Sequence, residues 1–558
     1  MWIEALARAR DIGRLQEIAS ILIRHGLGDV VQRSGLGNAL QKAGKALHWD
    51  APQRIAQRTT PERVRLAFEE LGPTFVKLGQ VLSGRTDLLD PEWTEELAKL
   101  QQNVREVAFD ELREQMTEDL GRPPEEVFDE LQTEPLAAAS IAQVHRARLP
   151  DGTDVVLKIR RPGIDAVVLA DLRLLTRLAE LVEDEMPELR RYQPRRVVRQ
   201  FERTIKDELD LAVEGRNTRV IAENMVDQLG IVIPAIYTEY SSKRLLVQEF
   251  LDGPSATRWI QDPSVVEIDG AQVAARGADA VLKMVFEDGV YHADPHPGNM
   301  VFLGGDRIGL LDFGMVGRLS AARRVEFTSL LAAAVDRNEE RAVEVLLGWS
   351  SGEEPDHEAL SQDVSAFIDR YHGVTMESLD VNQLLADIAE IVRRNGLVMP
   401  SDVSMLLRAF VTLDGLVGAL APDFQLAEHV TPFARRAVAA HYAPQAVFRR
   451  GLRDLTDVLG HLPQDLRALL ARARHGNLKV DLDLKRLDDF GRQIDHSANR
   501  LTMGMITAAL IVGTSIALTV SGGPQLFGLP LFALLGFVSS LAFGLWLLWS
   551  IARSGRQR

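Results

Sequence analysis

The chain contains the stretch His292-Ala293-Asp294-Pro295-His296-Pro297-Gly298-Asn299, followed by Leu310-Leu311-Asp312-Phe313-Gly314. Asn299 lies five residues after Asp294, and Asp312 lies 18 residues after it. Two short runs of strand-forming residues, 300–302 and 308–311, lie on either side of a Gly-Gly-Asp turn, which predicts a small hairpin between the two stretches. Carboxylate and amide oxygens are the ligands that Mg²⁺ prefers when it bridges the phosphates of a nucleotide.

The order and spacing of these residues match two motifs of protein kinases, the catalytic loop H-x-D-x-x-x-x-N and the D-F-G segment. On this interpretation Asp294 is the base or the water-orienting carboxylate, and Asn299 and Asp312 bind Mg²⁺. The alternative is an ordinary turn rich in Asp, Asn, Pro and Gly that precedes a buried strand. Two weak motifs in the right order, across a predicted hairpin, favour phosphoryl transfer from ATP.

A lysine upstream fits the same interpretation. Residues 141–149 and 154–160 predict a β-hairpin around a turn that contains Asp151-Gly152. Lys158 lies among apolar residues of the second strand, where a cation needs an anionic partner. We expect it to hold the α- and β-phosphates, oriented by Glu214 from a helix predicted over 195–227. A lysine that keeps an edge strand soluble is the alternative.

Two further segments are expected to contact the nucleotide. The segment 246–253 fits a strand that leads into a hinge, where backbone groups of Glu249 and Leu251 would meet adenine. The loop before the hairpin has alanines where a protein kinase has G-x-G-x-x-G, and alanine lacks the positive-φ freedom of glycine. The expected phosphate-covering residues of this loop are Ala137, Ala138, Ala139, Ser140 and Ile141.

Composition limits the other possibilities. The chain has 558 residues, a formal net charge of −15 and no cysteine. The acidic excess argues against nucleic acid as a partner, and the absence of cysteine excludes disulfides and thiolate metal sites. Two uncharged apolar runs, 501–520 and 526–551, are each long enough to span a bilayer as a helix, with arginines outside both ends. We predict a transmembrane hairpin with both ends on the cytoplasmic side; a buried hairpin of a soluble core is the alternative.

The chain resembles the UbiB/AarF family of atypical kinase-like proteins, which is associated with ubiquinone biosynthesis. The resemblance covers about residues 60–330. It is carried by four segments: Lys77-Leu78-Gly79-Gln80 (K-x-G-Q), the alanine-rich stretch 137–145, Glu208-Leu209-Asp210 (E-x-D), and the 292–299 loop together with Asp312-Phe313-Gly314.

The resemblance implies an α+β, two-lobed protein-kinase-like fold with an N-terminal helical extension and a C-terminal transmembrane helical hairpin. We place the helical extension at 1–130, the N-lobe at 131–253 and the C-lobe at 254–440. A helical juxtamembrane segment would cover 441–500, and the two transmembrane helices 501–552.

The K-x-G-Q segment predicts an amphipathic helix. The resemblance implies that this helix lies over the active-site cleft, where Lys77 would pair with Glu208 of the E-x-D motif; an ordinary exposed Lys/Gln pair is the alternative. Such a covered cleft would exclude a polypeptide substrate. The regulatory residues implied in this way are Lys77, Gly79, Gln80, Glu208 and Asp210.

The expected function is that of an atypical kinase or ATPase that binds ATP and Mg²⁺ and supports isoprenoid-quinone synthesis. The expected partners are lipid or quinone intermediates, the inner (cytoplasmic) membrane and the enzymes of quinone biosynthesis, and we also consider a homodimer. The kinase-like domain would face the cytoplasm. Two rival hypotheses remain: a true protein, lipid or small-molecule kinase, and a nucleotide-binding scaffold for biosynthetic enzymes.

Overall fold

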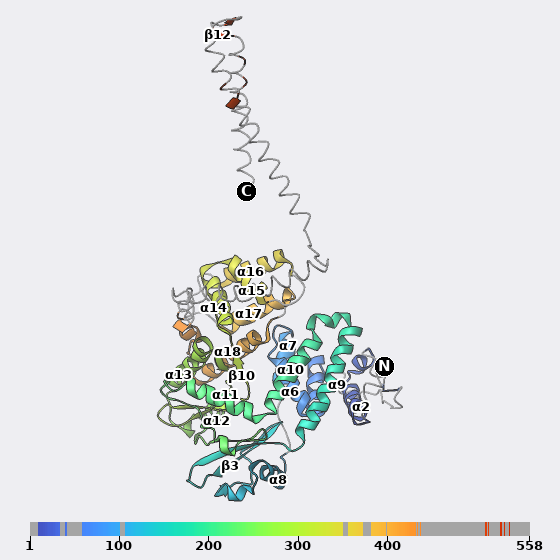
Figure 1. Ribbon diagram of the computed structural model, residues 1–558, viewed down its shortest axis with the longest axis vertical. Helices are drawn as coiled ribbons and strands as arrows, with labels where there is room; N and C mark the ends of the chain where they lie inside the picture. Colours follow the sequence, from blue (N-terminus) through green and yellow to red (C-terminus); the bar gives the residue numbers. More distant parts are fainter. Residues whose placement is uncertain are drawn as a thin grey trace, which may run out of the picture. The chain divides into compact units, whose positions relative to one another are not determined.

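Figure 1 shows the computed structural model of the chain. It describes residues 9–33, 40–41, 58–100, 106–349, 355–371, 381–397 and 399–430, and beyond them only 432–433, 436, 508–509, 512, 525–526, 529–530, 535 and 539. The chain divides into two compact units, Met1–Phe448 and Arg449–Arg558. In the second unit the described part includes the antiparallel pair β11 (Gln525–Leu526) and β12 (Leu529–Pro530). The predicted juxtamembrane segment and transmembrane hairpin lie outside the described residues, apart from these few positions.

An antiparallel sheet forms the smaller lobe of the first unit. Its strands run in the order β1 (Glu130–Leu131), β3 (Ala142–Arg148), β4 (Asp154–Arg160) and β6 (Leu245–Glu249), and β2 (Ala137–Ala138) also pairs with β3. Lys158 on β4 is paired with Val144 on one side and with Leu246 on the other. The predicted hairpin is therefore present, and its lysine lies on a central strand.

Helix α8 (Phe109–Leu120) packs against this sheet and contributes to its core. Its residues Leu112 and Met116 lie in one apolar cluster with Val155, Leu157 and Val247 of the sheet. Although we grouped this helix with the N-terminal extension, its apolar face is part of the sheet's own core.

A second group of helices lies beside the sheet (Figure 1) and shares an apolar cluster of its own. The group consists of α2 (Ala9–Arg24), α3 (Gly28–Arg33), α5 (Thr60–Leu71), α6 (Pro73–Ser83), α9 (Ile164–Glu185) and α10 (Pro194–Glu208). Helix α7 (Pro91–Ala98) packs on α6 through a smaller cluster that contains Leu97, Val76 and Leu100. Helix α6 carries the K-x-G-Q segment, and it contacts α5, α7, α9 and α10. The N-terminal helices are therefore packed onto the lobe that carries Lys158.

The prediction of a single helix over 195–227 is wrong, because the helix is interrupted at the E-x-D motif and two helices form. Helix α10 ends at Glu208, and α11 (Leu211–Asn224) starts a new helix. Asp210 has non-helical backbone angles, and its carboxylate accepts the Ala212 N–H at 3.1 Å. An aspartate that caps a helix N-terminus in this way favours a new start over continuation.

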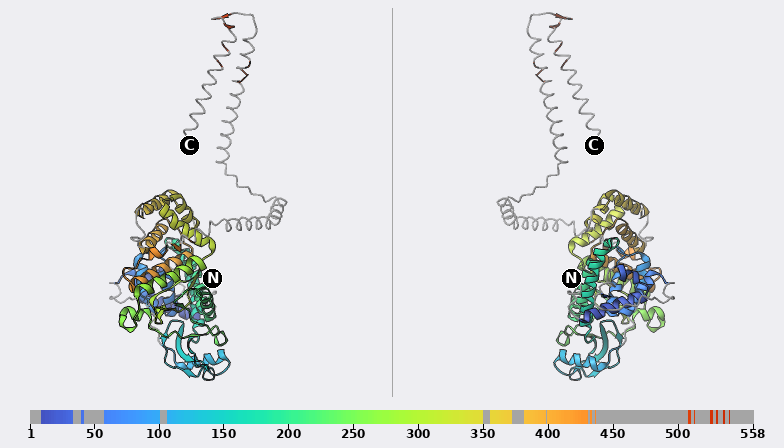
Figure 2. Two further views of the ribbon diagram at one scale, coloured as in Figure 1. Left: turned by 90° about the vertical axis from the view of Figure 1, so that its left-hand side faces the viewer. Right: turned by 90° about the vertical axis from the view of Figure 1, so that its right-hand side faces the viewer.

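The larger lobe is mainly helical. Its helices are α12 (Ala256–Gln261), α13 (Gly270–Lys283), α14 (Ala321–Asp336), α15 (Glu339–Trp349), α16 (His357–Tyr371), α17 (Val381–Arg394) and α18 (Ser401–Leu420). Figure 2 shows α14 to α17, in yellow and orange, at the end of this unit opposite the sheet. Among the described residues α18 alone is long and apolar enough to cross a membrane. Its buried side chains, such as Leu406, Phe410 and Leu413, belong to the core of this lobe.

Two small sheets hold the predicted catalytic residues at the edge of the larger lobe. Strand β7 (Val290–His292) pairs with β10 (Val316–Arg318), and β8 (Met300–Phe302) pairs with β9 (Ile308–Leu310). The hairpin between the two motifs is present as predicted. The strand predicted at 231–237 is shorter, since only β5 (Ile231–Val232) forms and pairs in parallel with β9.

Gly79 of the K-x-G-Q segment lies where two helices come into close contact. A Cβ placed on it would overlap Leu100 Cδ1 and lie 3.0 Å from Phe68 Cδ2. Gly79 has no left-handed backbone angle. The glycine is therefore required by the space available, and it lets α6 approach the chain that follows α7.

We predict that Gly79→Ala lowers the free energy of unfolding of the first unit by about 1–3 kcal/mol, because the added methyl group overpacks this contact. The matched control is Gly13→Ala on α2, where a Cβ meets nothing within 4 Å. That control should be neutral or stabilising by up to about 1 kcal/mol, since alanine has the higher helix propensity. Denaturant unfolding of the full chain measures both, and equal stability of the two variants would contradict the packing argument.

Candidate active site

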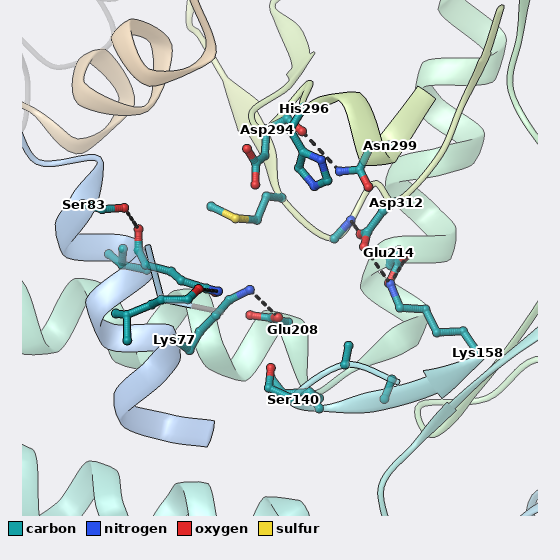
Figure 3. A pocket seen from close by; sticks show the side chains of 18 of the residues that line it. Lys77, Ser83, Ser140, Lys158, Glu208, Glu214, Asp294, His296, Asn299 and Asp312 are labelled. Atoms are coloured by element: carbon teal, nitrogen blue, oxygen red, sulfur yellow. Dashed lines mark hydrogen bonds and ion pairs between the residues drawn. The ribbon is translucent and has the colours of Figure 1, made fainter. Parts of the chain in front are cut away.

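A cavity of about 520 Å³ lies between the sheet, helix α6 and the larger lobe. Figure 3 shows how its side chains face one another. The lining residues from the predicted motifs are Lys77, Gln80, Ala139, Ser140, Ile141, Ala142, Lys158, Glu208, Glu214, Asp294, His296, Asn299, Asp312 and Gly314. The structure thus brings together residues that lie as far apart in sequence as Lys77 and Asp312.

Lys158 lies between two carboxylates. Its Nζ donates to the Glu214 oxygens at 2.7 and 2.8 Å and lies 3.3 Å from Asp312 Oδ2. The Glu214 side chain is only 6% exposed, whereas that of Asp312 is 50% exposed. The inner carboxylate therefore orients the lysine, and the outer one is accessible from the cavity.

The pKa values of this group follow from burial and mutual charge. Burial raises the pKa of Glu214 to about 7, although the Lys158 ammonium opposes the shift. Burial would lower the pKa of Lys158, but the charges of Asp312 and Glu214 outweigh it and raise that pKa. Burial would likewise raise the pKa of Asp312, and the charge of Lys158 keeps it well below its usual range. Lys158 and Asp312 thus stay charged, and Glu214 can take up a proton near neutral pH.

Hydrogen bonds within the loop hold the predicted catalytic residues. The Asn299 Nδ2 donates to the Asp294 carbonyl at 3.2 Å, which leaves the amide oxygen of Asn299 as its ligand group. The His296 Nδ1 accepts the Gly298 N–H at 2.9 Å. Asp294 and Asn299 are therefore kept on the same side of the loop.

His292 is a structural residue of this site that we did not single out from the sequence. Its Nδ1 accepts the Asp294 N–H at 3.2 Å, and its Nε2 lies 3.1 Å from the Leu311 carbonyl. Burial lowers the pKa of His292, so the ring is neutral, and a neutral ring that accepts at Nδ1 donates at Nε2. The imidazole joins the catalytic loop to the D-F-G segment. The first position of H-x-D is the sequence signal for this role.

Asp312 has an unusual backbone conformation. Its φ is +55°, a left-handed value that is uncommon for residues other than glycine. The conformation is supported by the Gly314 N–H, which donates to Asp312 Oδ1 at 3.1 Å, and by Asn217 Nδ2, which donates to the Phe313 carbonyl at 3.3 Å. Residues held in this region often belong to functional sites, where the surrounding structure maintains them.

The alanine-rich segment forms the tight turn between β2 and β3. The Ala139 N–H donates to the Ala142 carbonyl at 2.8 Å, and the Ala139 carbonyl accepts Nε of Arg161 at 2.8 Å. None of residues 137–142 has a positive φ. This loop therefore needs no glycine, which explains how alanines replace the glycine-rich loop. Ala137 and Ala138 form β2 and do not line the cavity.

Helix α6 forms the wall of the cavity opposite Lys158. Lys77 Nζ lies 2.5 Å from Glu208 Oε1, and both side chains are largely buried. Gln80 Nε2 donates to the Leu100 carbonyl at 3.5 Å and also faces the cavity. Asp210, by contrast, caps helix α11 and is not a cavity residue. Of the E-x-D motif, only the glutamate reaches the cavity.

The predicted adenine contacts are not part of this cavity. Neither Glu249 nor Leu251 lines it. The Glu249 N–H donates to the Ala235 carbonyl at 2.8 Å, and its carboxylate accepts the Ala235 N–H at 3.1 Å. The backbone N–H of Glu249, one of the groups that we expected near adenine, is thus satisfied by the chain itself.

A further cavity residue, Arg408 on α18, was also missed. Its Nη1 donates to the Gln80 carbonyl at 3.0 Å, and its Nη2 lies 3.4 Å from Asp294 Oδ2. No local motif surrounds Arg408, and it lies 114 residues from its carboxylate partner. Only the folded chain shows this contact.

The raised pKa of Glu214 predicts a pH dependence of stability. The unfolded chain loses this proton near pH 4.5, whereas the folded chain keeps it until about pH 7. The stability that Glu214 contributes is therefore fully present below pH 4.5 and lost as pH rises to about 7. The unfolding free energy of the wild type minus that of Glu214→Gln should therefore decrease by on the order of 3 kcal/mol as pH rises through this window.

Denaturant unfolding of the full chain at a series of pH values measures this difference. The control is Glu223→Gln, an exposed position on the same helix. Its difference from the wild type should stay level across the window. If the Glu214→Gln difference is equally level, the proposed proton on Glu214 is wrong.

Comparison with known proteins shows to which family the chain is related. Residues 99–346 match the model of the ABC1 atypical kinase-like domain, 364–425 the UbiB helical domain, and 485–553 the ABC1/UbiB kinase-like C-terminal domain. A relative from Shewanella baltica, named as a probable protein kinase UbiB, is 30% identical and covers 90% of this chain and 93% of its own. An uncharacterized protein from the hydrogenase 1 5′ region of Clostridium pasteurianum is 26% identical and covers 98% of this chain and 99% of its own.

Among solved structures, the Mycobacterium tuberculosis protein Rv3197 in complex with erythromycin is similar, with a TM-score of 0.46 and 20% identity. The match covers 63% of this chain and 89% of that one. The matched family models, together with the identity to the Shewanella relative over nearly the whole length, identify the fold as kinase-like. The chain belongs to the UbiB family of atypical kinase-like proteins.

Proposed function

We propose that this protein is a membrane-anchored atypical kinase or ATPase that binds ATP with Mg²⁺ and supports isoprenoid-quinone (ubiquinone) biosynthesis. The observation that carries the proposal is the Lys158–Glu214–Asp312 group, which faces Asp294 and Asn299 across one cavity. These are the residue types that phosphoryl transfer requires, held by hydrogen bonds in a fixed arrangement.

The charge and donor set of the cavity fit a nucleotide with its metal. Lys158 presents an ammonium group for phosphate oxygens, and Asp312 and Asn299 present oxygens for Mg²⁺. Within the described residues no group of three or more His, Asp or Glu side chains is placed to hold a metal by itself. Mg²⁺ is commonly bound by one or two protein oxygens together with nucleotide phosphates, and this site would bind it in that way. The bound ion would neutralise charge that develops on the phosphates.

The covered cleft supports a small acceptor. Helix α6 closes one side of the cavity through Lys77 and Gln80, and the Lys77–Glu208 ion pair fixes it to the end of α10. A polypeptide could reach Asp294 only if α6 moved away. We therefore propose that the acceptor is water or a small or lipid-like molecule.

The cellular part of the proposal rests on the family and on the sequence of the C-terminal region. The name UbiB belongs to the relatives, and the apolar runs at 501–520 and 526–551 are the predicted membrane anchor. The protein would act at the inner membrane with its kinase-like domain in the cytoplasm. Lipid or quinone intermediates, together with the enzymes that make them, would be its partners.

The enzymatic proposal predicts that Asp312→Asn lowers ATP turnover by 100-fold or more, on the order of the loss seen when charge stabilisation is removed from an active site. Asp294→Asn should lower turnover in the same assay. The matched control is Asp227→Asn, an exposed aspartate beyond the end of α11 that is not a cavity residue. The assay uses the full-length protein in lipid. Equal turnover of the wild type and Asp312→Asn would rule out ATP hydrolysis by this site.

The same variants test the cellular role. In a strain that lacks its own copy, the wild type and Asp227→Asn should restore the quinone profile, and Asp312→Asn should not. A profile that does not change when the protein is removed would exclude the biosynthetic role and leave the ATPase proposal standing. A phosphorylated small molecule or protein in the turnover assay would identify a true kinase.

A further inference from the structure

Arg408 connects the larger lobe to helix α6, which carries the K-x-G-Q segment, and to the loop that carries Asp294. It lies on α18, within the part of the chain that matches the UbiB helical domain. One guanidinium nitrogen donates to the Gln80 carbonyl of α6 at 3.0 Å, and the other lies 3.4 Å from the Asp294 carboxylate. The side chain is 22% exposed and is part of the cavity wall.

Both partners of Arg408 attract a positive charge. Helix α6 ends at Ser83, so the Gln80 carbonyl is one of the last four of the helix, which lack the backbone N–H partner of the helix interior. The Ser83 hydroxyl donates to this carbonyl at 2.8 Å, and Arg408 is its second donor. The end of a helix carries a partial negative charge, and a cation placed there is stabilising. The guanidinium therefore lies between a helix terminus and a carboxylate, and a planar group with several donors can contact both at once.

The charged side chains that line the cavity show which of them can neutralise Asp294. The lining contains four carboxylates, of Glu208, Glu214, Asp294 and Asp312. Its lysine and arginine side chains are those of Lys77, Lys158 and Arg408, and the imidazole of His296 also lines it. Lys77 lies against Glu208 and Lys158 against Glu214 and Asp312, which leaves Arg408 as the basic partner of Asp294 within this lining. The loop from Asp294 to Asn299 itself contains no lysine or arginine.

We propose that Arg408 is a positioning residue, which holds the Asp294 carboxylate in place and fixes it relative to the end of helix α6. The inference rests on the proposed function, in which Asp294 acts on the acceptor. Without the guanidinium, Asp294 would be an unpartnered carboxylate that faces a polyanionic nucleotide. The position of helix α6 and the orientation of the Asp294 carboxylate for reaction are thereby linked through one side chain.

Gly84 offers a way to displace Arg408 without removing its charge. A Cβ on Gly84 would lie 2.8 Å from Arg408 Cδ, and the glycine has φ −85° and ψ −1°, which any residue can adopt. Gly84→Ala should therefore push the arginine side chain aside and cause no backbone strain. The control is Gly415→Ala on α18, where a Cβ meets nothing within 4 Å.

The test compares ATP turnover and nucleotide binding of the full-length protein in lipid. We expect Arg408→Gln to lower kcat by about tenfold or more while KM for ATP and the affinity for ADP change by less than about threefold, since Arg408 does not contact Lys158 or Asp312 in this structure. Arg408→Lys should recover part of the loss, because an ammonium group can reach one of the two partners. Gly84→Ala should reproduce part of the loss. Arg370→Gln, which removes an exposed arginine on α16, and Gly415→Ala should match the wild type.

Three results would overturn the inference. The first is an unchanged or increased kcat in Arg408→Gln. The second is a loss in Arg408→Gln that Arg408→Lys does not recover at all. The third is a further loss when Arg408→Gln is added to Asp294→Asn, because a residue that acts through Asp294 has nothing left to position once that carboxylate is gone.

Hydrogen exchange separates this inference from the proposed function. Loss of the contact to Gln80 should raise amide exchange in the last turn of α6 in Arg408→Gln and in Gly84→Ala, but not in their controls. If Asp312→Asn abolishes turnover while Arg408→Gln leaves kcat intact, the positioning role fails and the ATPase proposal stands. If Asp312→Asn changes nothing, the ATPase proposal fails, and unchanged exchange in α6 then overturns the link through Arg408 as well.

Discussion

Lys158 carries a positive charge on a central strand of the sheet, and a buried charge is tolerated only when it is paired. Its partners come from two different parts of the fold: Glu214 from helix α11 and Asp312 from the segment after β9. The contacts of Lys158 with these two acids therefore fix the sheet, α11 and the D-F-G segment relative to one another. Removing one partner of such a buried pair typically costs about 3–5 kcal/mol, so this contact constrains the whole arrangement.

The same group also sets the charge of the site. Two carboxylates surround one ammonium, and the proton that Glu214 holds near neutral pH relieves the excess of negative charge. Asp312 stays ionised, and half of its side chain is exposed to the cavity. One carboxylate thus serves to orient the lysine, and the other remains an anion that a metal ion can approach. Both acids contact the same lysine, and the difference in their pKa arises from their other neighbours. The Gly314 N–H and Lys77 favour an ionised Asp312, whereas the charges of Asp312 and Glu208 oppose the ionisation of Glu214.

The opposite wall of the cavity follows a second constraint, the close packing of α6. Gly79 allows this helix to lie against Leu100, Lys77 pairs with Glu208, and Arg408 contacts the carbonyl of Gln80. The first contact is close packing, the second an ion pair and the third a hydrogen bond at the end of the helix. The three partners of α6 come from different parts of the chain. A helix held at several points is a permanent wall of the site, which is why the proposed acceptor is small.

Much of this site could be predicted from the sequence, because its residues lie in local motifs. The spacing of Asp294, Asn299 and Asp312 and the apolar surroundings of Lys158 identified the group that the structure brings together. The helix predicted across the E-x-D motif was wrong, since one capping aspartate, Asp210, outweighs the helical pattern around it. Arg408 could not be found, because its role comes from a contact between α18 and a loop 114 residues away.

The central claim is that the Lys158 group forms a site for ATP with Mg²⁺, and calorimetric titration of the full-length protein in lipid tests it most directly. The account predicts that ATP binds in the presence of Mg²⁺, that EDTA weakens this binding, and that Lys158→Met weakens it by at least tenfold while the exposed-lysine variant Lys99→Met does not. Equal affinity of the wild type and Lys158→Met, with or without Mg²⁺, would contradict it.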